Sequence, residues 1–94
     1  YLYYDRANLF AQEKNYDRAI EDYTRALQLD NSLAEAYYNR GLVRIFAGKR
    51  DAGLQDLSKA GELGLFDAYS IIKQENLQEQ KTEKASKKNK VSCC

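Results

Sequence analysis

The residue types that most often carry catalysis are missing or scattered in this chain. Its 94 residues include two cysteines and no histidine, so neither thiol can belong to a cysteine–histidine pair. No serine stands in a nucleophile-elbow context, and no glycine-rich loop could cradle a phosphate. The neighbouring carboxylates Glu21 and Asp22 are interpreted as a solvated helix face rather than a catalytic dyad. The sequence therefore predicts a protein that is not an enzyme and that uses no cofactor and no metal.

The two cysteines, Cys93 and Cys94, are adjacent and follow residues 84–90, which hold four lysines and no acid. Adjacent cysteines are not spaced like a metal site and cannot staple a fold. A Cys-Cys end after a polybasic stretch resembles the doubly prenylated ends of Rab-type small GTPases, in which lipid and positive charge anchor a protein to a membrane. The alternative is a solvated tail, because the GTPase body on which that lipidation depends is absent. Lipidation of Cys93 and Cys94 is the less favoured interpretation.

Charge is distributed unevenly along the chain. Residues 1–73 carry ten basic and eleven acidic side chains, whereas residues 74–94 carry five and three. A nucleic-acid-binding domain should present a basic face on its folded body, and this body is close to neutral. We therefore expect no nucleic-acid partner.

Apolar residues form no run near the roughly 20 that are needed to span a bilayer, and no stretch resembles a signal peptide. We expect a cytoplasmic protein without membrane association. The chain begins at Tyr1 in the middle of a pattern, so we also expect it to be part of a longer protein.

The strongest pattern is an internal repeat of 34 residues. The chain has no proline and five glycines, and it is rich in helix-forming residues. A period of this size is typical of stacked helical repeats. The identical pairs at this offset are Tyr3 and Tyr37, Tyr4 and Tyr38, Arg6 and Arg40, Asp17 and Asp51, Asp22 and Asp56, Ala26 and Ala60, and Leu29 and Leu63.

Helical periodicity predicts helices over about residues 2–14, 16–29, 33–47 and 50–63, with a fifth from about residue 66. Asn15 is expected to take the left-handed conformation that ends a helix, and Gly48 and Gly64 mark later helix ends. Ser32 and Glu35 form a capping-box signature. Gly53 is expected where a neighbouring helix approaches closely.

The inward residues are predicted to be Tyr3, Arg6, Ala7, Leu9 and Phe10, then Ala19, Ile20, Tyr23, Ala26 and Leu27, then Leu54, Leu57, Ala60 and Leu63, and last Ala68, Tyr69, Ile71 and Ile72. Glu21 with Arg25 and Arg18 with Asp22 are expected as ion pairs on the outer face.

Residues 2–64 resemble the tetratricopeptide repeat family. The matching residues are Tyr3, Ala7, Phe10, Ala19, Tyr23 and Ala26 in the first unit, and Tyr37, Gly41, Gly53, Leu57 and Ala60 in the second. The resemblance implies an all-α array of antiparallel helix pairs, with unit 1 over residues 1–33, unit 2 over 34–65, a capping helix over 66–80 and a flexible basic tail over 81–94. Arg6 and Arg40 stand at the usual Leu position and Arg44 at the usual Tyr, which is tolerable at exposed sites.

In this family the concave groove, lined by the first helix of each pair, binds peptides. The resemblance thus implies a protein–protein interaction scaffold. The positions that would line its groove are Tyr4, Asp5, Asn8, Gln12, Glu35, Tyr38, Asn39, Leu42 and Phe46. Tyrosine and asparagine suit an extended peptide, because aromatic faces and amides contact main chain of either polarity. Alternatively, the asparagines are merely solvated, and Leu42 and Phe46 pack under the fifth helix.

One sub-class of the family clamps a C-terminal carboxylate with two lysines, two asparagines and an arginine. Asn8 and Asn39 fall on the asparagine positions, but Tyr4 replaces the first lysine, and Asp67 and Ile71 stand where the last two cations would be. We therefore do not expect this clamp. The leading alternative function is assembly or self-association through the N-terminal edge, which includes Tyr1, Leu2 and Tyr3 with Ile20 and Leu27. A lipid-anchored adaptor is the third hypothesis.

Overall fold

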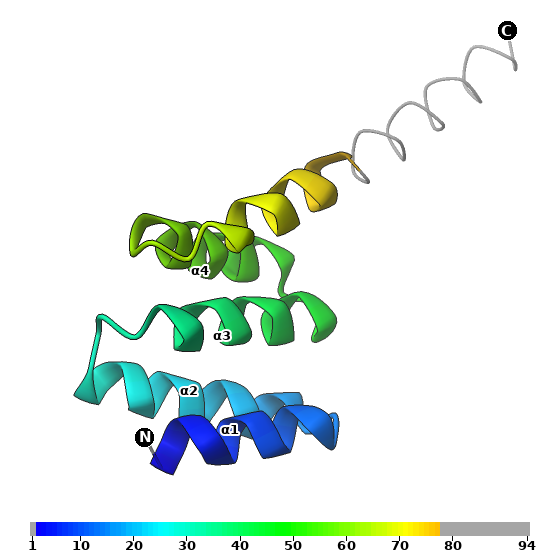
Figure 1. The fold of residues 1–94 in the computed structure, drawn as a ribbon. Helices are drawn as coiled ribbons and strands as arrows, with labels where there is room; N and C mark the ends of the chain where they lie inside the picture. Colours follow the sequence, from blue (N-terminus) through cyan, green and yellow to red (C-terminus); the bar gives the residue numbers. More distant parts are fainter. Residues whose placement is uncertain (1, 78–94) are drawn as a thin grey trace, which may run out of the picture.

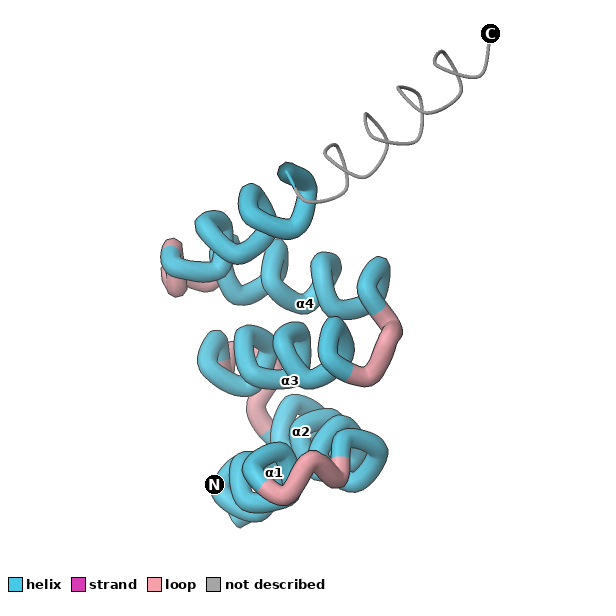
Figure 2. The backbone as a smooth tube through the Cα atoms, turned by 90° about the vertical axis from the view of Figure 1, so that its right-hand side faces the viewer, coloured by secondary structure: helices cyan, strands magenta, loops and turns pink. Residues whose placement is uncertain are grey.

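The computed structural model describes residues 2–77 and shows only helices over that range. They are α1 (Leu2–Gln12), α2 (Tyr16–Leu29), α3 (Ala34–Phe46) and α4 (Arg50–Glu62), followed by a fifth helix over residues 67–77. Each helix packs against the one before it, and the hairpins stack in chain order from α1 to the fifth helix (Figures 1 and 2). The predicted all-α array of antiparallel helix pairs is confirmed. The lysine-rich stretch, Cys93 and Cys94 lie outside the described residues.

Small residues allow these helices to approach closely. Ala7, Ala19 and Ala36 are fully buried between α1, α2 and α3, beside the large side chain of Tyr23. Between α3 and α4, a Cβ atom added at Gly53 would lie 2.6 Å from the Gly41 carbonyl oxygen. This confirms the expectation that Gly53 marks a close approach of two helices.

Two apolar clusters fill the interior, and α3 contributes to both. The first contains buried residues of α1, α2 and α3, and the second is built around Leu57 and Ala60 of α4 with Ala68 of the fifth helix. Tyr37 packs against both clusters. Arg50 ties the fifth helix to the start of α4, because its guanidinium donates to the carboxylate of Glu75 (3.2 Å) and to the Glu75 carbonyl (2.6 Å).

Three helix ends share one turn geometry. The amide of the third residue after each helix end donates to a carbonyl five residues earlier: Asn15 to Phe10 (2.8 Å), Lys49 to Arg44 (2.7 Å) and Leu65 to Ala60 (3.0 Å). The residue before each donor has a positive φ, namely Lys14 (62°), Gly48 (86°) and Gly64 (110°). This is the Schellman arrangement, in which the left-handed residue lets the chain reverse. The prediction for Asn15 was wrong by one position, because the left-handed residue is Lys14.

Other details of the helix ends and faces also differ from the predictions. Asp30 Oδ1 accepts hydrogen bonds from the Ser32 amide (3.1 Å) and hydroxyl (2.6 Å), so Leu33 stands at the start of α3 and no capping box forms. These bonds lower the pKa of Asp30. Leu9 is 59% exposed because it lies about 200° around α1 from the buried Ala7. Leu63 is 38% exposed because it follows the last turn of α4.

Candidate functional site

Four polar side chains from three helices form a hydrogen-bonded network beside α1 and α3. Asn8 Oδ1 on α1 accepts hydrogen bonds from the hydroxyl of Tyr23 on α2 and from Asn39 Nδ2 on α3, the latter at 3.2 Å. Asn39 Nδ2 also donates to the hydroxyl of Tyr4, at 3.0 Å. The structure thus brings together Tyr4, Asn8 and Asn39, which the sequence placed in one groove, although they lie up to 35 positions apart.

The network fixes which amide groups remain available. Both hydrogens of Asn39 Nδ2 are used, so its Oδ1 remains as an acceptor, and the two bonds to Asn8 Oδ1 leave its Nδ2 hydrogens as donors. Within residues 2–77 no buried side-chain nitrogen or oxygen lacks a partner, so these remaining groups face solvent. The arrangement therefore leaves one donor group and one acceptor accessible on two residues that line the same hollow.

Two hollows adjoin this network. The larger, of about 310 Å³, is lined by Asn8, Ala11, Gln12, Tyr23, Asn39, Leu42 and Val43. The smaller, of about 260 Å³, is lined by Tyr4, Asp5, Leu33 and Glu35. Among the described residues, no lysine or arginine lines either hollow, and Asp5 and Glu35 are exposed carboxylates. We call these two hollows together the groove.

Two of the residues that were predicted to line the groove border neither of the two hollows. Tyr38 packs against the second apolar cluster. Phe46 is 68% exposed at the end of α3, with its ring 6.3 Å from the ring of Tyr16. The other seven positions border the two hollows. Partner binding by all nine positions remains a prediction.

Sequence reasoning missed the polar role of Tyr23. At the 34-residue offset Tyr23 corresponds to Leu57, and both side chains are buried, so the repeat indicated an apolar core position. Burial raises the pKa of Tyr23 above its ordinary value. The available signal was the exchange of leucine for tyrosine in a core position, since a buried hydroxyl needs a hydrogen-bond partner.

The structure also corrects the interpretation of Arg6 and Arg40. Each guanidinium forms a two-pronged pair with a carboxylate of the following helix: Arg6 with Asp22 at 2.7 and 2.9 Å, and Arg40 with Asp56 at 2.8 and 2.7 Å. Arg44 adds a third bond to Asp56 at 2.7 Å. The arginines are thus specific partners of buried carboxylates, although the Arg6 side chain is itself 49% exposed.

Of the two ion pairs that were expected on the outer face, the structure contains one. Asp22 faces Arg6 rather than Arg18, so the expected pair of Arg18 with Asp22 was wrong, whereas Arg25 meets Glu21 at 3.1 Å as expected. The hydrogen bonds from Arg6 lower the pKa of Asp22 and raise that of Arg6. Arg40 also donates to the Thr24 hydroxyl (3.1 Å), which joins the first helix pair to the second.

Residues 2–77 contain neither a cluster of metal ligands nor a helix that could cross a membrane. Over this range no three or more cysteines and carboxylates are grouped as ligands for a metal ion. Over the same residues no helix is long and apolar enough to cross a membrane.

Known proteins are similar to this chain over the helices that build the groove. A family model described as TPR repeat matches residues 7–44. Similar proteins include an Hsp70-Hsp90 organizing protein of Triticum aestivum, 37% identical over 60 residues, and Hsp70-Hsp90 organizing protein 3 of Arabidopsis thaliana, 35% identical over 57 residues. These matches cover 64% and 61% of this chain but 10% of each relative, so the chain spans about a tenth of their length. They support a role in protein–protein interaction. Residues 7–44 thus match the tetratricopeptide repeat family, and the 34-residue period and the stacked helix pairs agree with that match.

Proposed function

We propose that this chain binds an extended segment of a partner protein in the groove along α1 and α3. The supporting observation is the fixed pair of free groups on the two asparagines. A main-chain carbonyl of the segment would accept from Asn8 Nδ2, and a main-chain amide would donate to Asn39 Oδ1. Because the neighbouring tyrosines hold both amides in place, little side-chain entropy is lost on binding.

The groove's charges favour a neutral or basic segment. Asp5 and Glu35 border the hollow beside Tyr4, and no cation lines it. Lysine or arginine of a bound segment would lie near these carboxylates and beside an aromatic ring, which also attracts cations. A segment that ends in carboxylates would meet like charge instead. The hydroxyl of Tyr4, which stands where the carboxylate clamp has its first lysine, accepts a hydrogen bond from Asn39.

The names of the relatives guide the choice of first partners. Because both relatives are Hsp70-Hsp90 organizing proteins, we take Hsp70 and Hsp90 chains as the first proteins to test. The composition of the groove indicates that an internal neutral or basic segment of such a chain would bind, rather than an acidic end.

The test is a titration of the full chain with fluorescent peptides that tile Hsp70 and Hsp90, followed by anisotropy. We expect Asn39→Ala to weaken the best peptide about ten-fold, since it removes an acceptor and releases Tyr4 and Asn8. Gln55→Ala, on the exposed face of α4, is the control and should leave binding unchanged. Circular dichroism checks that each variant is folded. Equal affinity of Asn39→Ala and the parent chain would contradict binding in this groove.

A charge exchange tests the polarity of the segment in the same assay. Asp5→Lys should weaken a basic peptide several-fold and reduce the salt dependence of its binding, because Asp5 is exposed and lies outside the hydrogen-bonded network. Asp51→Lys makes the same charge change on α4, away from both hollows, and is the matched control. Stronger binding of acidic than of basic peptides by the parent chain would overturn the proposed polarity.

A further inference from the structure

The half of the groove beyond the two asparagines is apolar. In the larger hollow, Ala11, Leu42 and Val43 lie about one helical turn further along α1 and α3 than Asn8 and Asn39. The side chains of these three residues carry no hydrogen-bonding group, so water beside them has few partners. An apolar side chain of a bound segment would displace that water favourably.

An exposed aromatic ring extends this apolar half. Phe46 follows Leu42 by four residues, so it lies on the same side of α3 one turn further on. Its side chain is 68% exposed, and its ring lies 6.3 Å from the ring of Tyr16. Covering the free part of the Phe46 ring would remove more apolar surface from water. We call Ala11, Leu42, Val43 and Phe46 the apolar end of the groove.

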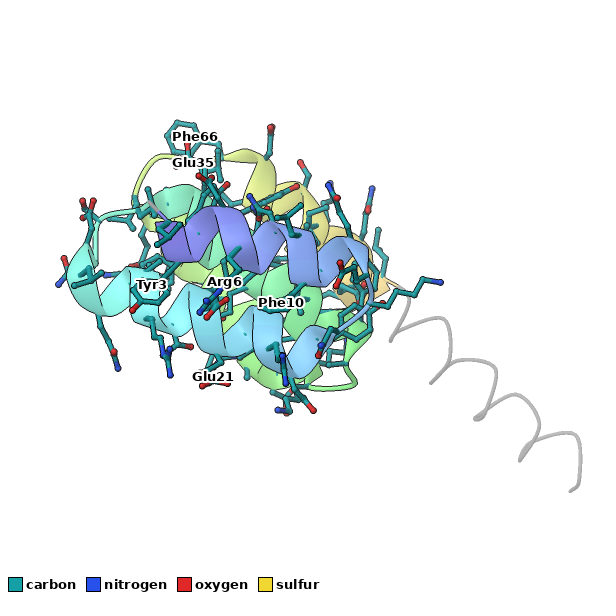
Figure 3. The ribbon with its side chains drawn as sticks, turned by 90° about the horizontal axis from the view of Figure 1, so that it is seen from below. Tyr3, Arg6, Phe10, Glu21, Glu35 and Phe66 are labelled. Carbon is teal, nitrogen blue, oxygen red and sulfur yellow. The ribbon has the colours of Figure 1, made fainter. Side chains whose placement is uncertain are left out.

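The opposite end of the groove is acidic. Asp5 and Glu35 border the smaller hollow, and each stands in the first turn of its helix. Figure 3 shows Glu35 on the side of α1 that is opposite to α2 and Glu21. Within residues 2–77, the side chains of Asp5 and Glu35 form no hydrogen bond or ion pair. Both carboxylates are therefore available to a cation of a bound segment.

The length of the groove sets the spacing between the side chains that fill its two ends. On α3, Leu42 and Val43 follow Glu35 by seven and eight residues, which corresponds to about 10–12 Å along the helix. An extended chain rises about 3.3 Å per residue, so roughly three or four residues span this length. Successive side chains of an extended chain point to opposite faces, so two side chains that both enter the groove are an even number of residues apart. A spacing of four residues meets both conditions.

We propose that the apolar end receives a large apolar side chain, such as leucine or phenylalanine, four residues from the lysine or arginine that lies at the acidic end. The residues between these two side chains pass Asn8 and Asn39, whose free amide groups contact main chain of any sequence. This arrangement rests on the proposed function and adds to it the class of segment that the groove selects.

A peptide series measures the spacing directly. Short acetylated and amidated peptides of serine, threonine and alanine carry one arginine and one leucine, separated by two to six positions in either order. Each is titrated against the full chain by anisotropy. We expect a separation of four to bind most tightly, and separations of three and five to bind about five-fold more weakly, because an odd separation turns one side chain away from the groove. Replacing the leucine by serine at a separation of four should weaken binding about ten-fold.

Changes in the chain assign each side chain of the peptide to one end of the groove. Phe46→Ala should lower the preference for leucine over serine about three-fold and leave the preference for arginine over glutamine unchanged, whereas Glu35→Gln should do the reverse. Gln12→Leu adds apolar surface at an exposed position of the larger hollow and should raise the preference for leucine. Leu29→Ala removes an apolar side chain that is 77% exposed at the end of α2, outside the groove, and is the control for Phe46→Ala. Each preference is a ratio measured on one variant, so a change in its folded fraction cancels.

The outcomes separate this selectivity from groove binding itself. Equal affinity at every separation, or equal effects of Phe46→Ala on both preferences, would overturn the selectivity even if Asn39→Ala still weakens the peptides. No binding of the series at millimolar chain would overturn it as well, and the proposed function would then stand on the tiled peptides alone. Tiled peptides that bind Asn39→Ala and the parent chain equally would overturn both.

Discussion

At the scale of single residues, the two arginine–aspartate pairs distinguish this chain from a repeat held together by apolar contacts alone. Asp22 and Asp56 are 3% and 5% exposed, and a carboxylate at such depth stays charged only when donors replace its hydration. The planar guanidinium supplies two parallel hydrogen bonds to each. These pairs cross-link the two helices of each hairpin and fix their register.

The first pair predicts how stability changes with pH. Hydrogen bonds from Arg6 depress the pKa of Asp22 in the folded protein below the value of about 3.9 expected in the unfolded chain. The folded state therefore binds fewer protons in this range, so the pair contributes stability above that unfolded value and loses it as the pH falls through the folded pKa. Asp22→Asn should flatten the decline of the unfolding free energy between about pH 5 and pH 2.

Urea titrations followed by circular dichroism at a series of pH values measure that slope. Glu13→Gln removes an exposed carboxylate at the end of α1 and should leave the slope close to that of the parent chain. Parallel curves for Asp22→Asn and the parent would show that the pair does not persist in solution.

The arginine pairs also show that the contact partner of a residue cannot be predicted from its position in the family pattern alone. Compared with the family pattern, Arg6 and Arg40 looked like departures that an exposed site would tolerate, because each partner lies 16 residues away on another helix. The repeat nevertheless contained the signal, since both units carry an arginine and an aspartate at that same separation. Recurrence of two polar residues together, rather than of one, indicates that the same contact forms within each unit of this chain.

At the scale of elements, the turns after α1, α3 and α4 have the same geometry, but only two of them have glycine at the left-handed position. Gly48 and Gly64 occupy the left-handed position of their turns, but Lys14 occupies it in the first, at a φ of 62°. A residue with a Cβ atom is strained in this conformation by roughly 1 kcal/mol or more. The turn between α1 and α2 is thus the weakest of the three by local conformation.

Lys14→Gly should consequently stabilise the protein by about 1 kcal/mol, because glycine adopts the left-handed conformation without strain. Lys14 is exposed, so few contacts are lost. Thermal and urea unfolding measure the change. The reciprocal variant Gly48→Lys, at the equivalent position of the second unit, should destabilise by a similar amount, and no Cβ clash would confuse the result because no atom lies within 4 Å. A destabilised Lys14→Gly variant would contradict this assignment of strain.

Helix order and approximate bounds could be predicted because the 34-residue period and the apolar spacing extend over whole helices. The ends could not, because they depend on competing hydrogen bonds a few residues apart. Asp30 takes the hydroxyl and amide of Ser32, which the capping box would have required at the start of α3. Part of the groove could be predicted, because helical spacing indicates that Tyr4, Asn8 and Asn39 lie on the helix faces that border it. Tyr23 enters it from α2, which the family pattern assigns to packing.

At the scale of the whole molecule, α3 is the helix through which the two halves communicate. It supplies residues to both apolar clusters, whereas α1 contacts one and the fifth helix the other. In a linear array of this kind each unit contacts only its neighbours, so local changes spread over limited distances. The groove spans α1 and α3, so a change near the fifth helix should leave half of it intact.

Native-state hydrogen exchange should resolve this organisation. We expect α3 amides to exchange most slowly, and those of α1 and the fifth helix most rapidly, since a terminal helix can open without disturbing the rest.

Ala68→Gly removes a fully buried methyl group at the contact of the fifth helix with α4 and lowers helix propensity by about 1 kcal/mol. It should speed exchange in the fifth helix strongly, in α4 less, and in α1 hardly at all. Leu9→Ala, at an exposed position of α1, is the control and should leave the fifth helix unchanged. A uniform acceleration across all helices in Ala68→Gly would instead mean that the array opens as one cooperative unit, and changes at the far end would then reach the groove.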